Sequence, residues 1–98
     1  MNRDPNHTSE NDYAKVYVDV SAVFTRKGVM LPRLIAWENG RVYQISKVKS
    51  IRRIPDQDTH RCFLCYTCSI CGQDARLYYD GSFRWFLYRK VPVSKTLE

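Results

Sequence analysis

Apolar and polar residues alternate along several stretches of the chain, a pattern that predicts β-strands rather than helices. Between residues 14 and 24, Val16, Val18 and Val20 alternate with polar or aromatic positions. A period of two in a segment rich in β-branched residues is typical of a strand with one buried face. Residues 25–28, Thr-Arg-Lys-Gly, then predict a turn.

Two further strands are predicted in the first half of the chain. Residues 30–38 form the second strand, where Pro32 favours an edge or a bulge because proline has no N–H for the ladder. The third strand runs to about Ile54. Its alternation slips between Ile45 and Val48, which a bulge or a bend would explain.

Three short segments in the chain predict hairpin turns, and each turn implies a register. Asn39-Gly40 and Asp80-Gly81 each favour a two-residue type I′ turn, because that turn needs positive φ at both central residues. Gly72-Gln73 is interpreted as a third two-residue loop. In these registers the cross-strand pairs include Ala36 with Tyr43, Cys68 with Leu77, and Arg76 with Trp85.

The predicted elements together indicate an all-β domain. No segment carries apolar residues at i, i+3, i+4 and i+7 over the length of a helix. We expect residues 14–96 to form a single domain of about six strands in an antiparallel meander. Closure into a small barrel, SH3-like or similar, would remove exposed sheet edges. Residues 1–13 are polar and without periodicity, which predicts a flexible tail.

Length and composition fit one small soluble domain. The chain has 98 residues, 44% of them hydrophobic, which allows a single core. No apolar run approaches the roughly 18 residues of a membrane helix, and the N-terminus does not resemble a signal peptide. We therefore expect a cytoplasmic protein with reduced thiols, no membrane association, and a monomeric or homodimeric state.

Positive charge is concentrated in the predicted domain. The formal net charge is +6, and because residues 1–13 carry −2, residues 14–98 carry +8. Residues 41–53 hold five basic side chains and no acid. This basic stripe consists of Arg41, Lys47, Lys49, Arg52 and Arg53. It suits nucleic acid or an acidic partner, because neutralised phosphates release counterions. The alternative is a solvated face that keeps an edge strand soluble.

A cysteine-rich segment, H-R-C-F-L-C-Y-T-C-S-I-C at residues 60–71, raises the question of a metal site. The candidate ligands are His60, Cys62, Cys65, Cys68 and Cys71. Their number suffices for a structural zinc, and C-x-x-C is the usual half-site. However, zinc half-sites are normally separated by about a dozen residues or more, whereas two residues separate them here. The aromatic and β-branched residues between the cysteines favour a strand instead.

In a strand, a spacing of three sends successive cysteines to opposite faces. Cys62 and Cys68 would point one way and Cys65 and Cys71 the other, so that four ligands could not converge. We therefore favour cysteine as a small buried residue, with zinc as the alternative. The predicted core face comprises Cys62, Leu64, Tyr66, Cys68, Ile70, Ala75, Leu77, Tyr79 and Phe86.

The sequence gives little support to an enzyme. The chain has two histidines, His7 in the predicted tail and His60 at the junction of a loop and a strand. A cysteine nucleophile would need a base and a group that orients it, and no third group is apparent near His60 and Cys62. The sequence also lacks a Gly-rich phosphate loop and a paired-carboxylate motif.

Several motifs resemble a family of short proteins from Gram-positive bacteria that is catalogued as a domain of unknown function. The similar segments are V-x-V-x-A-x-F at Val18–Phe24, W-E-N-G-R-x-Y-x-I-x-K-V at Trp37–Val48, Y-T-C-x-I-C-G at Tyr66–Gly72, and L-Y-Y-D-x-x-x-R-W-F at Leu77–Phe86. The resemblance covers most of the domain. It implies a small β protein and carries no activity, and Cys62 and Cys65 depart from the family's pattern.

The leading functional hypothesis is a non-catalytic binding module that contacts nucleic acid through the basic stripe. Tyr43 or Trp85 would serve as a platform on which bases stack. One alternative is a protein-interaction or self-association module that pairs exposed strand edges. Another is a structural module stabilised by zinc at residues 60–71.

Overall fold

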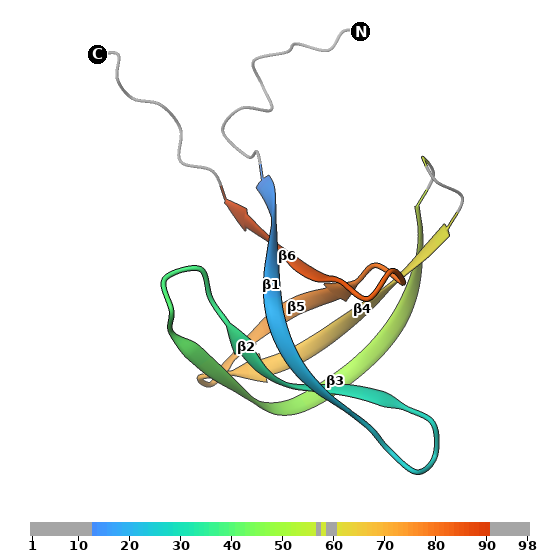
Figure 1. The fold of residues 1–98 in the computed structure, drawn as a ribbon, viewed down its shortest axis with the longest axis horizontal. Coiled ribbons are helices and arrows are strands. Elements are labelled where there is room, and N and C mark those ends of the chain that lie inside the picture. Colours follow the sequence, from blue (N-terminus) through green and yellow to red (C-terminus); the bar gives the residue numbers. More distant parts are fainter. Residues whose placement is uncertain (1–12, 57, 59–60, 91–98) are drawn as a thin grey trace, which may run out of the picture.

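The structure, a computed structural model, describes residues 13–56, 58 and 61–90. These residues form six strands and no helix, and therefore contain no helix that could cross a membrane (Figure 1). The strands are β1 (Tyr13–Phe24), β2 (Met30–Ala36), β3 (Val42–Asp56), β4 (Arg61–Ile70), β5 (Gln73–Tyr79) and β6 (Trp85–Lys90).

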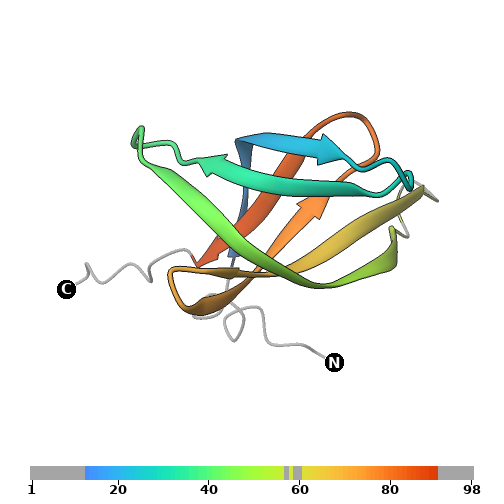
Figure 2. The same cartoon turned by 90° about the horizontal axis from the view of Figure 1, so that it is seen from below.

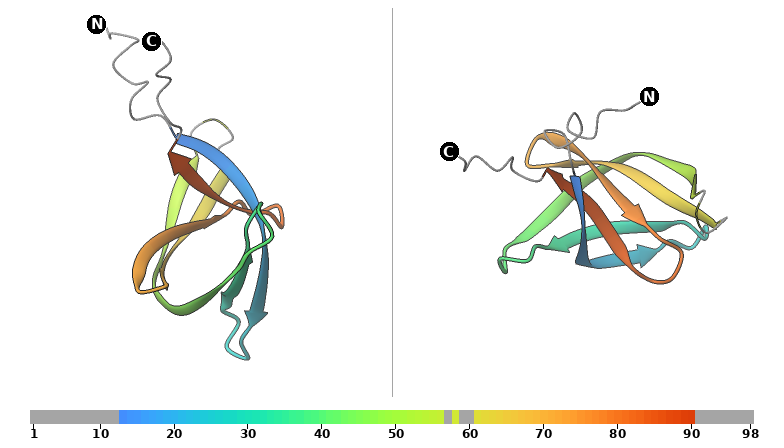
Figure 3. Two further views of the ribbon diagram at one scale, coloured as in Figure 1. Left: turned by 90° about the vertical axis from the view of Figure 1, so that its left-hand side faces the viewer. Right: turned by 90° about the horizontal axis from the view of Figure 1, so that it is seen from above.

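The strands form a closed antiparallel barrel in the order β1-β2-β3-β4-β5-β6, which confirms the predicted fold class. Two long strands each belong to two sheets. The first half of β1 pairs with β6 as far as Val18, and its second half pairs with β2 from Asp19 onward. β3 likewise passes from β2 to β4, and Figures 2 and 3 show it sweeping across the molecule.

Bulges occur where the strands bend, as the sequence indicated. Arg33, next to Pro32, is an extra residue opposite β1, because Ser21 pairs with Leu34 and the next pair joins Ala22 to Pro32. β3 contains two such irregularities opposite β4, at residues 46 and 49. An extra residue bends its strand and increases the local twist. The bulges therefore let one long strand serve two sheets.

The predicted register of the β2–β3 hairpin was wrong by one residue. Ala36 pairs with Val42, not with Tyr43. Gly40 has a φ of 87°, whereas Asn39 does not have positive φ, so the turn is not type I′. The Gly40 N–H donates a hydrogen bond to the Trp37 carbonyl, and the Trp37 N–H donates one to the Arg41 carbonyl. These two bonds close a three-residue loop. Such a loop typically joins a type I turn to a glycine bulge.

The turn after the cysteines is a two-residue loop, one residue earlier than predicted. Cys71 and Gly72 have φ values of 53° and 77°, as a type I′ turn requires. Cys68 consequently pairs with Ala75 rather than with Leu77. Because the register moves by two residues, the side chains of β4 and β5 keep their predicted faces.

The β5–β6 connection is longer than the predicted two-residue turn. Tyr79 pairs with Trp85, and the intervening residues form a loop in which Gly81 and Phe83 have positive φ. The predicted pairing of Arg76 with Trp85 was therefore wrong. The loop forms because the buried side chain of Asp80 accepts hydrogen bonds from within it.

The core lies inside the barrel. Its buried members are Val18, Ile35, Ile45, Tyr66, Cys68, Leu77 and Trp85, with partly buried residues such as Leu64, Ile70 and Tyr79 packed against them. This agrees with much of the predicted core face. Two residues were misplaced, because Trp85 points into the barrel where Phe86 was expected, and Cys62 is exposed.

Tyr13, expected to end the tail, is the first residue of β1. The rest of the predicted tail, residues 1–12, and the last part of the predicted domain, residues 91–96, lie outside the described residues.

Candidate nucleic-acid interface

One continuous row of side chains crosses five strands on the outside of the barrel. Residues that pair directly across antiparallel strands project from the same face of the sheet. The pairs join Arg52 to Cys65, Cys65 to Tyr78, Tyr78 to Phe86, and Phe86 to Tyr17. We call the side of β3, β4, β5, β6 and β1 that carries this row the outer face. The opposite side, which lines the barrel, is the inner face.

An aromatic cluster occupies the middle of the outer face. Phe86 is fully buried (0% exposed), although it points out of the barrel. Its ring stacks on Tyr78 with centroids 5.2 Å apart and meets Tyr17 and Phe63 edge-on at 5.8 and 5.3 Å. The Nζ atom of Lys15 lies 4.4 Å from the ring centroid, within the range of a cation-π contact. The outer face thus carries a buried aromatic ring that is covered by other side chains.

Exposed tyrosines surround this cluster. Tyr13 is 60% exposed, and Tyr17 and Tyr88 are each 46% exposed. Tyr13 and Tyr88 line a groove of about 760 Å³ together with Thr67, Asp74, Ala75, Arg76 and Tyr78. The groove lies where β6 leaves β5, because these two strands form only two pairs. Tyrosine rings at its wall present flat surfaces to solvent.

Part of the basic stripe lies on the outer face, at its β3 edge. Lys47 pairs with Ser69 and Arg52 with Cys65, so both belong to that face. The Lys49 Nζ lies 2.7 Å from the Asp74 carboxylate, and both side chains remain about half exposed. This ion pair neutralises some of the charge, while Lys47 and Arg52 are exposed.

The other predicted site residues lie elsewhere. Arg53 pairs with Leu64 and therefore belongs to the inner face. Arg41 is exposed in the β2–β3 turn. Tyr43 is half-buried and pairs with the buried Ile35. The stripe is therefore divided between different surfaces, because the turn and the β-strand alternation separate its members.

Trp85 cannot be the predicted stacking platform. It is 7% exposed and packs inside the barrel, with its ring centroid 5.3 Å from that of Tyr66 and 4.9 Å from that of Tyr79. The prediction was wrong because the longer β5–β6 loop changed the parity of β6. The exposed tyrosines of β1 and β6 take the position that Trp85 was expected to occupy.

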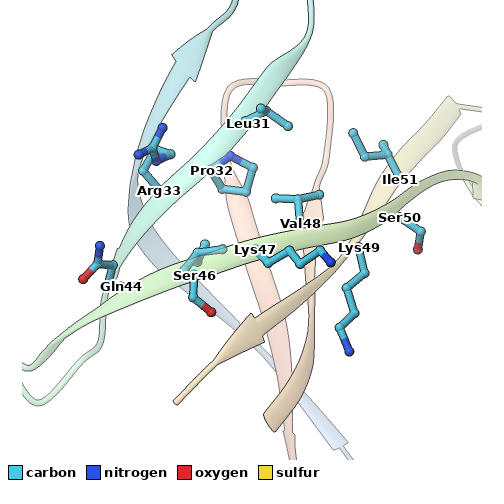
Figure 4. Close-up of a pocket in the computed structure, with 11 residues that line it drawn as sticks. Leu31, Pro32, Arg33, Gln44, Ser46, Lys47, Val48, Lys49, Ser50 and Ile51 are labelled. Carbon is cyan, nitrogen blue, oxygen red and sulfur yellow. The ribbon is translucent and has the colours of Figure 1, made fainter. Parts of the chain in front are cut away.

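A second groove, of about 770 Å³, opens between β2 and β3 (Figure 4). These strands form three pairs and then separate. In Figure 4, Pro32 and Val48 point into the opening, whereas Lys49 points away from it. The Tyr66 hydroxyl of β4 donates a hydrogen bond to the Met30 carbonyl of β2 at 2.7 Å. This bond occupies the Met30 carbonyl, and Pro32 has no backbone N–H to donate. Neither group is therefore available to pair with another strand.

The cysteine segment is extended, as predicted. Cys65 and Cys68 are buried on opposite faces of β4, and Cys71 lies in the following turn. Burial, reinforced by the nearby Cys65, raises the pKa of Cys68 to about 11, which keeps this thiol protonated at neutral pH. Among the described residues no group of three or more histidines, cysteines or acids lies close enough together to hold a metal. His60 lies outside them, and the zinc alternative stays a prediction.

Comparisons with known proteins add no further information about the site. No family model matches the chain, and no curated protein and no solved structure matches it either. The resemblance to a Gram-positive family of unknown function therefore stays an expectation.

Sequence reasoning missed the tyrosines of the outer face. The signal was present in β1, where Tyr13, Lys15 and Tyr17 alternate with the apolar residues assigned to the core. Tyr88 could not be placed in the same way, because the face of β6 depends on the length of the loop before it.

Proposed function

We propose that the protein binds single-stranded nucleic acid across the outer face. The observation that carries this proposal is the row from Arg52 to Tyr17, which joins a basic edge on β3 to a tyrosine-rich edge on β1 and β6. Phosphates would bind Lys47 and Arg52, with release of counterions. Unpaired bases would stack on the exposed rings of Tyr13 and Tyr88.

The single-stranded form fits this surface better than a duplex. Each base of a single strand has an open π-face that can stack on a tyrosine, whereas the bases of a duplex stack on one another. Arg76 of β5 lines the groove together with Tyr13 and Tyr88, and Lys15 of β1 pairs with Tyr88 of β6, so that cations lie next to the rings on this face. The net charge of +6 favours association with any polyanion.

The experiment is a fluorescence-anisotropy titration with labelled 12-nucleotide single strands of DNA and RNA, and with a duplex of the same length. If about three phosphates are neutralised, the affinity for a single strand should fall about 20-fold between 50 and 200 mM salt. The duplex should bind more weakly than the single strand. Absence of binding to every oligonucleotide at 50 mM salt would contradict the proposal.

A matched pair of variants separates local contacts from overall charge. The double substitution Lys47→Gln and Arg52→Gln should weaken binding and reduce the slope of log affinity against log salt by about 1.4. The control, Arg26→Gln with Lys27→Gln, removes the same charge from exposed positions in the β1–β2 turn. Equal effects of the two double variants would indicate that net charge, and not the outer face, determines binding.

A second candidate, association through strand edges, has one favourable location. β5 and β6 separate after two pairs, which leaves residues 73–77 of β5 and 87–90 of β6 without partners on the sides that face each other. The β2–β3 opening is less suitable, because bulges and proline discourage edge pairing. Binding of this kind would change little between 50 and 200 mM salt, and light scattering would detect self-association.

A further inference from the structure

Phe83 is the most exposed large hydrophobic residue in the part of the chain that the structure describes, with 89% of its surface accessible. Its φ of 67° lies in the left-handed region, where the side chain of a bulky residue is crowded against the backbone. Neither feature stabilises the fold. A phenylalanine that gains nothing from packing and is held in a disfavoured conformation calls for another explanation.

The loop that carries Phe83 is fixed from within by Asp80. One carboxylate oxygen accepts hydrogen bonds from the backbone N–H groups of Ser82 and Arg84 at 2.7 and 3.2 Å, and the other accepts one from Arg84 Nε at 3.1 Å. The Asp80 N–H in turn donates to the Arg84 carbonyl at 3.0 Å. Because these bonds flank residue 83 on both sides, they hold its backbone in one conformation.

Two neighbouring strands also hold the loop. Arg61 of β4 donates to the Ser82 hydroxyl at 2.9 Å. On the other side, the guanidinium of Arg84 lies 4.5 Å from the centre of the Tyr17 ring of β1. The Phe83 ring is therefore presented by a braced loop, next to cationic side chains and at one end of the outer face.

A groove lies beside the ring. It has a volume of about 430 Å³ and is lined by Tyr17, Val18, Asp19, Val20, Phe83, Arg84 and Trp85. The groove begins where β1 leaves β6, because Val18 and Trp85 form the last pair between these strands. Tyr17 belongs both to this groove and to the row that crosses the outer face, so Phe83 shares a groove with one end of that row.

We infer that Phe83 is a stacking residue for one unpaired base, with Arg84 beside it to bind the adjacent phosphate. This inference rests on the proposed function. Because the backbone that carries the ring is fixed before binding, little backbone freedom is lost when a base stacks on it. The Arg84 side chain is 61% exposed, although it is ion-paired with Asp80, and can contact a phosphate without leaving the loop. The adjacent cations favour a nucleotide over an uncharged apolar ligand.

The test compares binding and thermal stability in Phe83→Ala and Phe83→Gly. Loss of one base-stacking contact should weaken the binding of a single-stranded 12-mer about tenfold in both variants. The melting temperature of Phe83→Gly should be equal to that of the wild type or higher, because glycine adopts positive φ without strain. A structural role for the ring would lower the melting temperature instead.

Phe83→Trp supplies a direct optical signal. This variant should bind the single strand as tightly as the wild type. The single strand should quench its tryptophan emission more than it quenches that of the wild type, which contains Trp37 and Trp85. Binding by Phe83→Ala within twofold of the wild type, together with unchanged emission of Phe83→Trp, would overturn the inference while the proposed function stands.

The proposed function fails separately if the wild type binds no oligonucleotide. In that case Phe83→Trp is mixed with vesicles of phosphatidylserine, since an exposed aromatic ring beside cations could also enter an anionic lipid surface. A blue shift with vesicles and no response to oligonucleotide would assign Phe83 to lipid and overturn the inference.

Discussion

The two faces of the sheet bury aromatic side chains in different ways. On the inner face, Tyr66 and Leu77 are shielded by closure of the barrel itself. On the outer face, Phe86 is equally buried, yet its cover consists of side chains such as Lys15 and the half-exposed Tyr17. The first kind of burial depends on the backbone, whereas the second depends on side chains that can rotate. The cover of the outer face can therefore rearrange without opening the barrel.

The largest effect should follow from a cavity on the inner face. Leu77 is fully buried, so Leu77→Ala should lower the free energy of unfolding by about 2–5 kcal/mol, measured by urea denaturation. Tyr88→Ala, on the outer face, should cost less than about 1 kcal/mol because the ring is half exposed. Similar losses in the two variants would contradict the division between the faces.

A smaller effect on the free energy of unfolding, dependent on pH, is expected from the β5–β6 loop, which carries Phe83. Burial alone would raise the pKa of Asp80, but hydrogen bonds from Ser82 and Arg84, together with the charge of Arg84, lower it below its usual value. The carboxylate therefore stabilises the fold at pH values above about 4, and this contribution is lost as the pH falls through the lowered pKa.

Asp80→Asn should remove this contribution. We expect a loss of about 1–2 kcal/mol at pH 7, and a difference from the wild type that shrinks toward pH 2–3. Urea denaturation at several pH values measures it, with Asp19→Asn at an exposed position as the control. A difference that stays constant over this range would show that the charge of Asp80 has no role.

The smallest effect concerns the cover of the outer face. Lys15→Ala removes the cation above Phe86 and should cost about 0.5–1 kcal/mol in the free energy of unfolding, since the site remains exposed to solvent. It should also weaken nucleic-acid binding at low salt. A loss of stability as large as that of Leu77→Ala would mean that the outer cluster is a second structural core.

The sequence predicted the strands and the class of fold better than the registers. Alternation in β1, the bulge near Pro32 and the extended cysteine segment depend on local chemistry, and all three are confirmed. Registers depend on the length of each turn. Asp80-Gly81 has the sequence of a tight turn, but the Asp80 side chain stabilises a longer loop by accepting hydrogen bonds that a two-residue turn would not provide.

The candidate site was less predictable for the same reason. A change of parity in β6 exchanges Trp85 with Phe86, and this exchange turned the expected stacking platform into a core residue. The basic residues of β3 were identified correctly as exposed, but strand alternation places Arg53 on the inner face, whereas Lys47 and Arg52 share the outer face. Neither effect can be read from composition or spacing alone.

The row from Arg52 to Tyr17 also sets a length scale. It crosses five strands, and four steps of about 4.8 Å make it about 19 Å long. A footprint of this size corresponds to about four to six nucleotides, near the lower end of the range for an OB-fold barrel. On the proposed function, one molecule would hold a long strand weakly and briefly, and several copies side by side would be needed to coat it.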